Sequence, residues 1–409
     1  MKKSINQKSH ADITSACMKE SDMADIDLEF LREELLQCRR CGICRDAVYA
    51  AKGFDGICPV WKHTSGFETS FMRGKIQVAL ALLDGTLEKT EENASSLYQC
   101  TLCGNCNQIC PAEFHPAQAL EQVREVLNEI PNEVRDSIAE RITRVGNPYS
   151  DDNLEKMEWL QALGFDVAEQ ADVLYYVGCT AGMRIPKIAI DAAKILNAAP
   201  GEFAVLRDEP CCGSVMLRTG KVNEAETMAK RLEDAIRSTG AKKVVVSCAG
   251  CLKTLRMDYP ERFGIELPEV LHIVEYADEL IRNGKIEPKP LSSPTRLTYH
   301  DPCHIGREMG IYDSPRHVLE SIPGIELVEM ETNRNTAICC GAGGGLRSFD
   351  SDTAKKIGSA RVRDAEDTGA EKIVSACPFC EHNLKAGTEL IGSNIDVVDV
   401  VDLLARALE

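Results

Sequence analysis

Eighteen of the 19 cysteines in this 409-residue chain fall into groups of eight, five and five, and only Cys17 stands outside them. Thiolate sulfur binds zinc, copper and iron–sulfur clusters, so clustered cysteines indicate bound metal. Disulfide frameworks are typical of small secreted domains, whereas this chain is long and its polar N-terminus has no apolar export segment. We therefore expect a cytoplasmic metalloprotein.

The group of eight consists of two runs with ferredoxin-like spacing. The first is Cys38-x2-Cys41-x2-Cys44 with a later Cys58-Pro59, and the second is Cys100-x2-Cys103-x2-Cys106-x3-Cys110-Pro111. In bacterial ferredoxins the last cysteine of such a run ligates the other cluster. This spacing predicts two cubane [4Fe-4S] clusters, one on Cys38, Cys41, Cys44 and Cys110 and the other on Cys100, Cys103, Cys106 and Cys58. Two zinc sites are the alternative, but zinc takes four ligands in two Cys-x2-Cys pairs.

The two groups of five occupy matching places in two copies of one sequence pattern. They are Cys179, Cys211, Cys212, Cys248 and Cys251 in the first copy, and Cys303, Cys339, Cys340, Cys377 and Cys380 in the second. The four irons of a cubane have one outward valence each, so five thiolates favour an opened, non-cubane [4Fe-4S] cluster in each copy. A redox-active Cys-x2-Cys pair would leave three cysteines of each copy unexplained, and a zinc site would leave one.

The elements that must position these cysteines predict a mixed α+β and α/β fold. In each copy a β-branched run precedes the Cys-x2-Cys pair and a helical pattern follows it, which places the cysteines at the carboxyl ends of strands. We expect two pseudo-symmetric α/β (Rossmann-like) domains at residues 172–288 and 295–409. A helical ferredoxin-type domain at 27–130 and a helical connector at 131–171 precede them, after a disordered tail at 1–26.

Composition and glycine pattern exclude several function classes. A net charge of −17 argues against nucleic acid as a partner, and no apolar stretch is long enough to span a bilayer. The glycine run at 341–345 lacks the Gly-Lys-Ser/Thr of a P-loop, so we expect neither a nucleotide nor a flavin. Beside the paired cysteines, Gly213, Gly341 and Gly343 are instead predicted to let backbone N–H groups approach cluster sulfur.

The Cys-Cys-Gly motifs at 211–213 and 339–341, with their flanking spacings, resemble the paired cysteine-rich (CCG) domains of heterodisulfide reductases. With the ferredoxin-like segment in front, the chain resembles the methanogen members in which the iron–sulfur and catalytic parts are fused. Iron–sulfur subunits of glycerol-3-phosphate, glycolate and lactate dehydrogenase complexes have the same order of parts. An electron-transfer subunit is therefore the alternative function, and a zinc-binding interaction protein is a third.

The resemblance implies a CoB–CoM heterodisulfide reductase of methanogenesis. Two non-cubane clusters would face each other across the mixed disulfide of coenzyme M and coenzyme B and split its S–S bond homolytically. Electrons would arrive through the two cubanes from a membrane cytochrome b subunit, which would hold the chain peripherally on the inner face of the cell membrane. His304 is the candidate catalytic proton donor, and Arg184, Arg307 and Arg347 are candidates for binding the sulfonate and phosphate. A packing histidine and solvated arginines are the alternatives.

Overall fold

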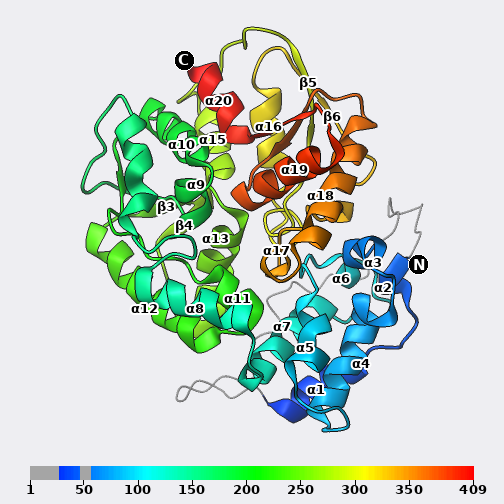
Figure 1. Ribbon diagram of the computed structural model, residues 1–409. Coiled ribbons are helices and arrows are strands. Elements are labelled where there is room, and N and C mark those ends of the chain that lie inside the picture. Colours follow the sequence, from blue (N-terminus) through cyan, green and yellow to red (C-terminus); the bar gives the residue numbers. More distant parts are fainter. Residues whose placement is uncertain (1–26, 47–56) are drawn as a thin grey trace, which may run out of the picture.

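The computed structural model describes residues 27–46 and 57–409 (Figure 1). The predicted disordered tail at 1–26, with Cys17, lies outside the described residues. The described chain forms a helical N-terminal part followed by two α/β parts, which confirms the predicted fold class. In Figure 1 the helical part (blue and cyan) lies below the first α/β part (green) and the second (yellow to red).

Most helices of the N-terminal part pack around one apolar core, whereas the last of them, Glu133–Val145, packs on the first α/β part. Leu31, Leu35, Ile76 and Leu120 are among the buried residues of that core. Helix α1 begins after Asp27, whose carboxylate accepts hydrogen bonds from the first backbone N–H groups of the helix and so caps it. The helices are α1 (Leu28–Leu36), α2 (Ile43–Asp46), α3 (Pro59–His63), α4 (Met72–Leu83), α5 (Glu91–Tyr98), α6 (Asn105–Ile109), α7 (Pro116–Val126) and α8 (Glu133–Val145).

The described residues of the α/β parts form two four-stranded, fully parallel sheets with the same strand order. The first sheet has the order β2-β1-β3-β4, with β1 (Val173–Tyr176), β2 (Phe203–Val205), β3 (Lys243–Val246) and β4 (Glu269–His272). The second has the order β6-β5-β7-β8, with β5 (Thr295–Tyr299), β6 (Ile325–Val328), β7 (Lys372–Ser375) and β8 (Asp396–Asp399). The repeat in the sequence is therefore a repeat in topology.

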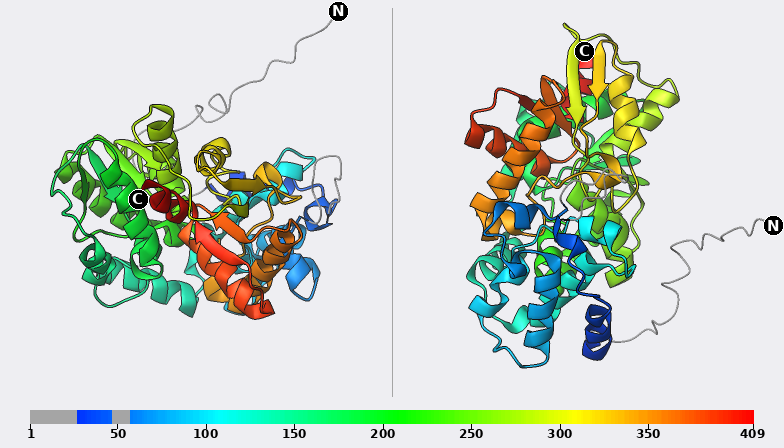
Figure 2. Two further views of the ribbon diagram at one scale, coloured as in Figure 1. Left: turned by 90° about the horizontal axis from the view of Figure 1, so that it is seen from above. Right: turned by 90° about the vertical axis from the view of Figure 1, so that its right-hand side faces the viewer.

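Helices connect the strands in each α/β part, and one continuous core joins the two. The first part contains α9 (Cys179–Met183), α10 (Pro186–Ala198), α11 (Ser214–Thr219), α12 (Val222–Thr239), α13 (Ala249–Lys253), α14 (Tyr259–Phe263) and α15 (Ile273–Arg282). The second contains α16 (Asp313–Glu320), α17 (Leu346–Phe349), α18 (Ser351–Glu366), α19 (Pro378–Ile391) and α20 (Val400–Leu408). Helix α10 packs on α20 and α15 packs on α16, so the two parts adjoin, as both views in Figure 2 show.

The strands end immediately before the cysteines. In the first part β1 ends three residues before α9, which begins at Cys179, and Cys248 is the N-cap of α13. In the second part Cys303 lies in the turn after β5, and Cys377 is the N-cap of α19. Because the carboxyl ends of parallel strands lie at the same edge of a sheet, this arrangement gathers the cysteines of each copy.

Candidate iron–sulfur sites and active-site cavity

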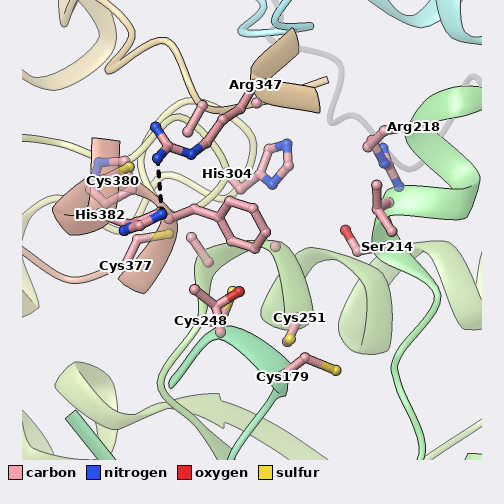
Figure 3. A pocket seen from close by; sticks show the side chains of 18 of the residues that line it. Cys179, Ser214, Arg218, Cys248, Cys251, His304, Arg347, Cys377, Cys380 and His382 are labelled. Carbon is pink, nitrogen blue, oxygen red and sulfur yellow. Dashed lines mark hydrogen bonds between the residues drawn. The ribbon is translucent and has the colours of Figure 1, made fainter. Parts of the chain in front are cut away.

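A cavity of about 390 Å³ lies between the two α/β parts, and all ten cysteines of the two five-cysteine groups line it. Cys303 is half-buried and the other nine are buried. Figure 3 shows labelled cysteines of both copies around this space, together with His304, Arg218 and Arg347. The structure thus brings the two predicted non-cubane sets to one cavity.

Within each copy the sulfur atoms of different motifs are in contact. Cys212 Sγ is 3.4 Å from Cys251 Sγ, and Cys340 Sγ is 3.3 Å from Cys380 Sγ. None of the 18 cysteines among the described residues is in a disulfide. Buried free thiols at such short separations fit a shared metal cluster, because thiolate sulfur is the usual ligand of iron in these clusters.

The helical part has two smaller cavities, lined by four and five cysteines. The outer cavity is lined by Cys38, Cys41, Cys44 and Cys110, and the inner cavity by Cys58, Cys100, Cys103 and Cys106, with Cys44 also at its edge. These are the two sets predicted for the cubanes, and four thiolates are the number that a cubane needs. Iron ligation at both remains a prediction.

The electrostatics of the inner cavity fit a negatively charged group. Burial raises the pKa of the Cys58 thiol to about 12, so a thiolate there requires compensating positive charge. Lys75 lines the cavity, and its ammonium donates to the carbonyls of Thr69 (2.9 Å) and Ser96 (2.5 Å). Arg124 is fully buried and also donates only to carbonyls, those of Leu97, Cys100, Arg218 and Gly344.

The glycines beside the paired cysteines serve two different purposes. Gly213 and Gly341 have φ angles of 77° and 95°, and their N–H groups donate to Cys211 Sγ (3.5 Å) and Cys339 Sγ (3.3 Å). Gly343 instead faces the helical part, since a Cβ atom there would lie 2.6 Å from the carbonyl oxygen of Thr101. Its absent side chain therefore permits contact between the parts of the molecule.

Two of the three arginines singled out from the sequence line the main cavity. Arg184 lies over the ring of Tyr149, and Arg347 donates to Asn383 Oδ1 (2.5 Å) and His382 Nε2 (2.9 Å). Neither forms an ion pair with a carboxylate of the described residues, so both keep their charge available for an anion. Figure 3 shows the Arg347–His382 contact.

Arg307, by contrast, does not line the cavity. Its guanidinium donates to the carbonyls of Cys103 (2.5 Å) and Ala337 (2.6 Å), which ties the inner cysteine loop to the second α/β part. Arg218, which sequence reasoning missed, does line it, but Asp258 and Glu121 neutralise its charge. The sequence does contain a pattern that would have indicated Arg218. A Leu-Arg pair follows each Cys-Cys-Gly motif, at 217–218 and 346–347.

His304 lines the cavity and is half-buried. Burial, with the positive charges of Lys253 and Arg218, lowers its pKa to about 3. The protein groups around it therefore keep the imidazole neutral near neutral pH. A neutral imidazole can donate one hydrogen bond to sulfur, but it is a poor source of a whole proton.

Comparisons with known proteins agree with this arrangement. The cysteine-rich (CCG) domain model matches residues 173–256 and 297–385, and the 4Fe-4S dicluster domain model matches 34–114. A solved structure of a hypothetical protein from Helicobacter pylori has a TM-score of 0.57 at 8% identity, covering 83% of this chain and 68% of its own, and supports the fold alone. No helix among the described residues has the length and apolar character needed to cross a membrane.

Curated relatives match along most of the chain. The D subunit of dihydromethanophenazine:CoB–CoM heterodisulfide reductase from Methanosarcina barkeri is 35% identical over 391 residues, which cover 92% of this chain and 94% of the relative. Its Methanosarcina acetivorans counterpart is 36% identical with the same coverage. The B subunit of the fumarate reductase (CoM/CoB) of Methanothermobacter marburgensis is 32% identical over 86% of this chain and 70% of its own. The chain therefore belongs to the family of heterodisulfide reductase D subunits, which are iron–sulfur oxidoreductases.

Proposed function

We propose that this chain reduces the mixed disulfide of coenzyme M and coenzyme B to the two thiols in the cavity between its α/β parts. The reaction consumes two electrons and two protons and breaks one S–S bond, so that each sulfur leaves as a thiol. The observation that carries the proposal is that both complete five-cysteine groups line one cavity. An electron relay needs only one closed cluster at each step, whereas a disulfide presents two sulfurs and needs two electrons.

The cysteines of each set would hold one cluster. Two cubane [4Fe-4S] clusters would occupy the cavities of the helical part, and two non-cubane [4Fe-4S] clusters would be bound by the five-cysteine groups. When bound, such clusters supply electrons one at a time. A partner would supply these electrons.

Side chains of the cavity would bind and orient the disulfide. Arg184 and Arg347, which have no carboxylate partner among the described residues, would bind the sulfonate and the phosphate of the two coenzymes. The neutral His304 would donate its N–H to the sulfur that leaves near Cys303, which stabilises a thiolate before a proton arrives from solvent. His304 therefore acts as a hydrogen-bond donor in this proposal, in place of the proton donor expected from the sequence.

The electron donor would be a membrane cytochrome b subunit. Cys41, which lines the outer cavity, is exposed. The outer cavity is therefore the cysteine-lined cavity that a donor could reach from the surface. Docking of the donor at this end would place the chain peripherally on the inner face of the cell membrane. The family relationship supports a complex, and the identity of this donor is part of the proposal.

The test uses anaerobically purified full-length protein with reduced viologen as an artificial donor. Four clusters of four irons give about sixteen irons per chain. We expect viologen oxidation with the coenzyme M–coenzyme B disulfide and none with cystine. Full iron loading without turnover would contradict the proposal and favour an electron-transfer role beside a separate catalytic partner. His304→Ala at full iron content is expected to lower kcat, and wild-type turnover would remove its role.

A further inference from the structure

His300 lies against two sulfurs of the second copy and has no role in the proposed function. It follows β5, and its imidazole, Cys340 Sγ and Cys380 Sγ offer ligand atoms within 4.8 Å of one another. All three residues are buried. The neighbouring Cys339 and Cys380 thiols and His300 lower the pKa of the Cys340 thiol, although burial opposes them.

The position of the proton on the His300 ring follows from its other neighbour. Arg361 is fully buried, and its Nε–H donates to His300 Nδ1 at 3.3 Å. Two bonds to Thr332, at 2.9 and 2.7 Å, hold the guanidinium in place. Arginine only donates, so Nδ1 must accept and the ring proton lies on Nε2. The Nε2–H group is therefore the ring donor that remains available to a cysteine sulfur. Because a protonated ring nitrogen cannot bind a metal, Nε2 is not an iron ligand in this tautomer.

The first copy differs at the matching position. Tyr176 stands three residues before Cys179, as His300 stands three residues before Cys303. The hydroxyl of Tyr176 donates to the carbonyl oxygen of Pro210 at 2.9 Å, so its proton is not available to a cysteine sulfur. At this position, therefore, only the second copy has a side-chain donor directed to cysteine sulfur. The first copy instead has the buried ammonium of Lys156 beside Cys179 and Cys211.

The second copy is also the one next to the inner cavity of the helical part. The thiols of Cys103 and Cys339 lie close enough to shift each other's pKa, and Arg307 donates to the carbonyls of both Cys103 and Ala337. Electrons that leave the inner set therefore reach the copy with the histidine first.

We propose that His300 is a positioning residue whose Nε2–H donates to the Cys340 thiolate and raises the reduction potential of the second-copy cluster. A hydrogen bond to cluster sulfur stabilises the negative charge that reduction adds. The inference rests on the clusters of the proposed function, but it does not depend on the identity of the disulfide.

The test is a redox titration of the anaerobic holoprotein followed by EPR, with wild type, His300→Phe and His300→Gln. With iron content unchanged, His300→Phe is expected to lower the potential of one non-cubane signal and to leave the other and the cubane signals in place. His300→Gln keeps an N–H donor and should recover part of the shift. Tyr176→Phe is the matched control, and neither non-cubane potential should move in it. If both non-cubane potentials are the same in the wild type and in an iron-replete His300→Phe variant, the inference is overturned.

A spectroscopic test on the wild type does not depend on any variant folding. Hyperfine spectroscopy before and after exchange into ²H₂O should detect an exchangeable proton coupled to one non-cubane cluster, with only weak ¹⁴N coupling. Strong ¹⁴N coupling would show that His300 is an iron ligand and would overturn the hydrogen-bond assignment. Failure of the disulfide to turn over would contradict the proposed function, and the potentials and the proton coupling would still be measurable.

Discussion

Cys248 and Cys377, which hold matching places in the two copies, line the same cavity, and each thiol shifts the pKa of the other across the boundary between the α/β parts. The second cysteine of its own Cys-x2-Cys pair, Cys251 or Cys380, also shifts the pKa of each thiol. The two five-cysteine sets therefore adjoin at these two thiols. Two cluster sites that share so short a boundary can act on the two sulfur atoms of a single disulfide.

Removal of one cysteine from either five-cysteine set is expected to prevent the binding of one iron–sulfur cluster. Cys248→Ala and Cys377→Ala should each lower the iron content from about sixteen to about twelve per chain, because each set holds four irons. The cubane EPR signals should persist in both variants. Iron and acid-labile sulfide analysis of anaerobic protein measures this. Cys17→Ala, outside all three groups, is the control and should keep full iron, whereas full iron in both cavity variants would refute the assignment.

Loss of the cavity arginines is expected to weaken substrate binding. A hydrogen-bonded charge pair contributes about 1.5–3 kcal/mol, so Arg184→Ala or Arg347→Ala should raise KM for the anionic disulfide roughly 10- to 100-fold. Viologen-coupled kinetics measure KM and kcat separately. Arg237→Ala is the control, because Arg237 is exposed and pairs with Glu233. An unchanged KM in both cavity variants would mean that the anions bind elsewhere.

Arg124 is expected to be essential for the association of the three parts. Arg124→Met leaves buried carbonyls of all three without a donor, which should lower the free energy of unfolding by about 3 kcal/mol or more. Denaturant unfolding measures the loss, and limited proteolysis should cut the variant faster. Arg144→Met is the matched control, since Arg144 is exposed and pairs with Asp151, and it should change stability by about 0.5 kcal/mol at most. Similar stability of the two variants would contradict this role.

His272 is expected to make stability depend on pH. Burial lowers its pKa to about 4, and its Nδ1 accepts the N–H of Val274 as the cap of α15. Below pH 6.5 His272 binds a proton in the unfolded chain, whereas in the folded chain it stays neutral down to about pH 4. The free energy of unfolding therefore decreases as the pH falls through this range. The loss between pH 7 and pH 5 should be about 2 kcal/mol.

The variant that tests this effect is His272→Asn. Asn keeps an acceptor for the cap, as Asp399 provides at the matching position in the second copy, and it does not titrate. Denaturant midpoints measured from pH 7 to pH 5 should fall less steeply in the variant than in the wild type. Parallel slopes would assign the pH dependence to other groups.

The sequence was sufficient for the cysteine sets and for the two-copy α/β architecture. The spacings along the chain and the position of each cysteine after a strand are local properties, and parallel strands then bring Cys179, Cys211 and Cys248 to one edge. That the two sets face one cavity was expected only from the resemblance to heterodisulfide reductases. Thus the cysteine composition of the main cavity could be predicted from the sequence.

Contacts between distant segments could not be predicted in this way. Arg307 follows Cys303 closely, yet it lies in a turn that directs it to the carbonyl of Cys103, about two hundred residues earlier. Gly343 lines the main cavity, but its close contact with Thr101 was not expected. The role of His300 depends on the buried Arg361, which carries no motif. Side-chain direction and long-range packing decide these three cases.

The glycine run after Cys339-Cys340 has a further consequence for kinetics. A Cβ atom at Gly344 would lie 2.3 Å from the carbonyl oxygen of Cys100, so the two loops touch backbone to backbone. No layer of side chains separates the inner cysteine loop from the second-copy loop at this point. Electron tunnelling slows exponentially as its distance grows, and an alanine here would widen the barrier while leaving both ends intact. At these positions the residue type sets a rate of electron passage.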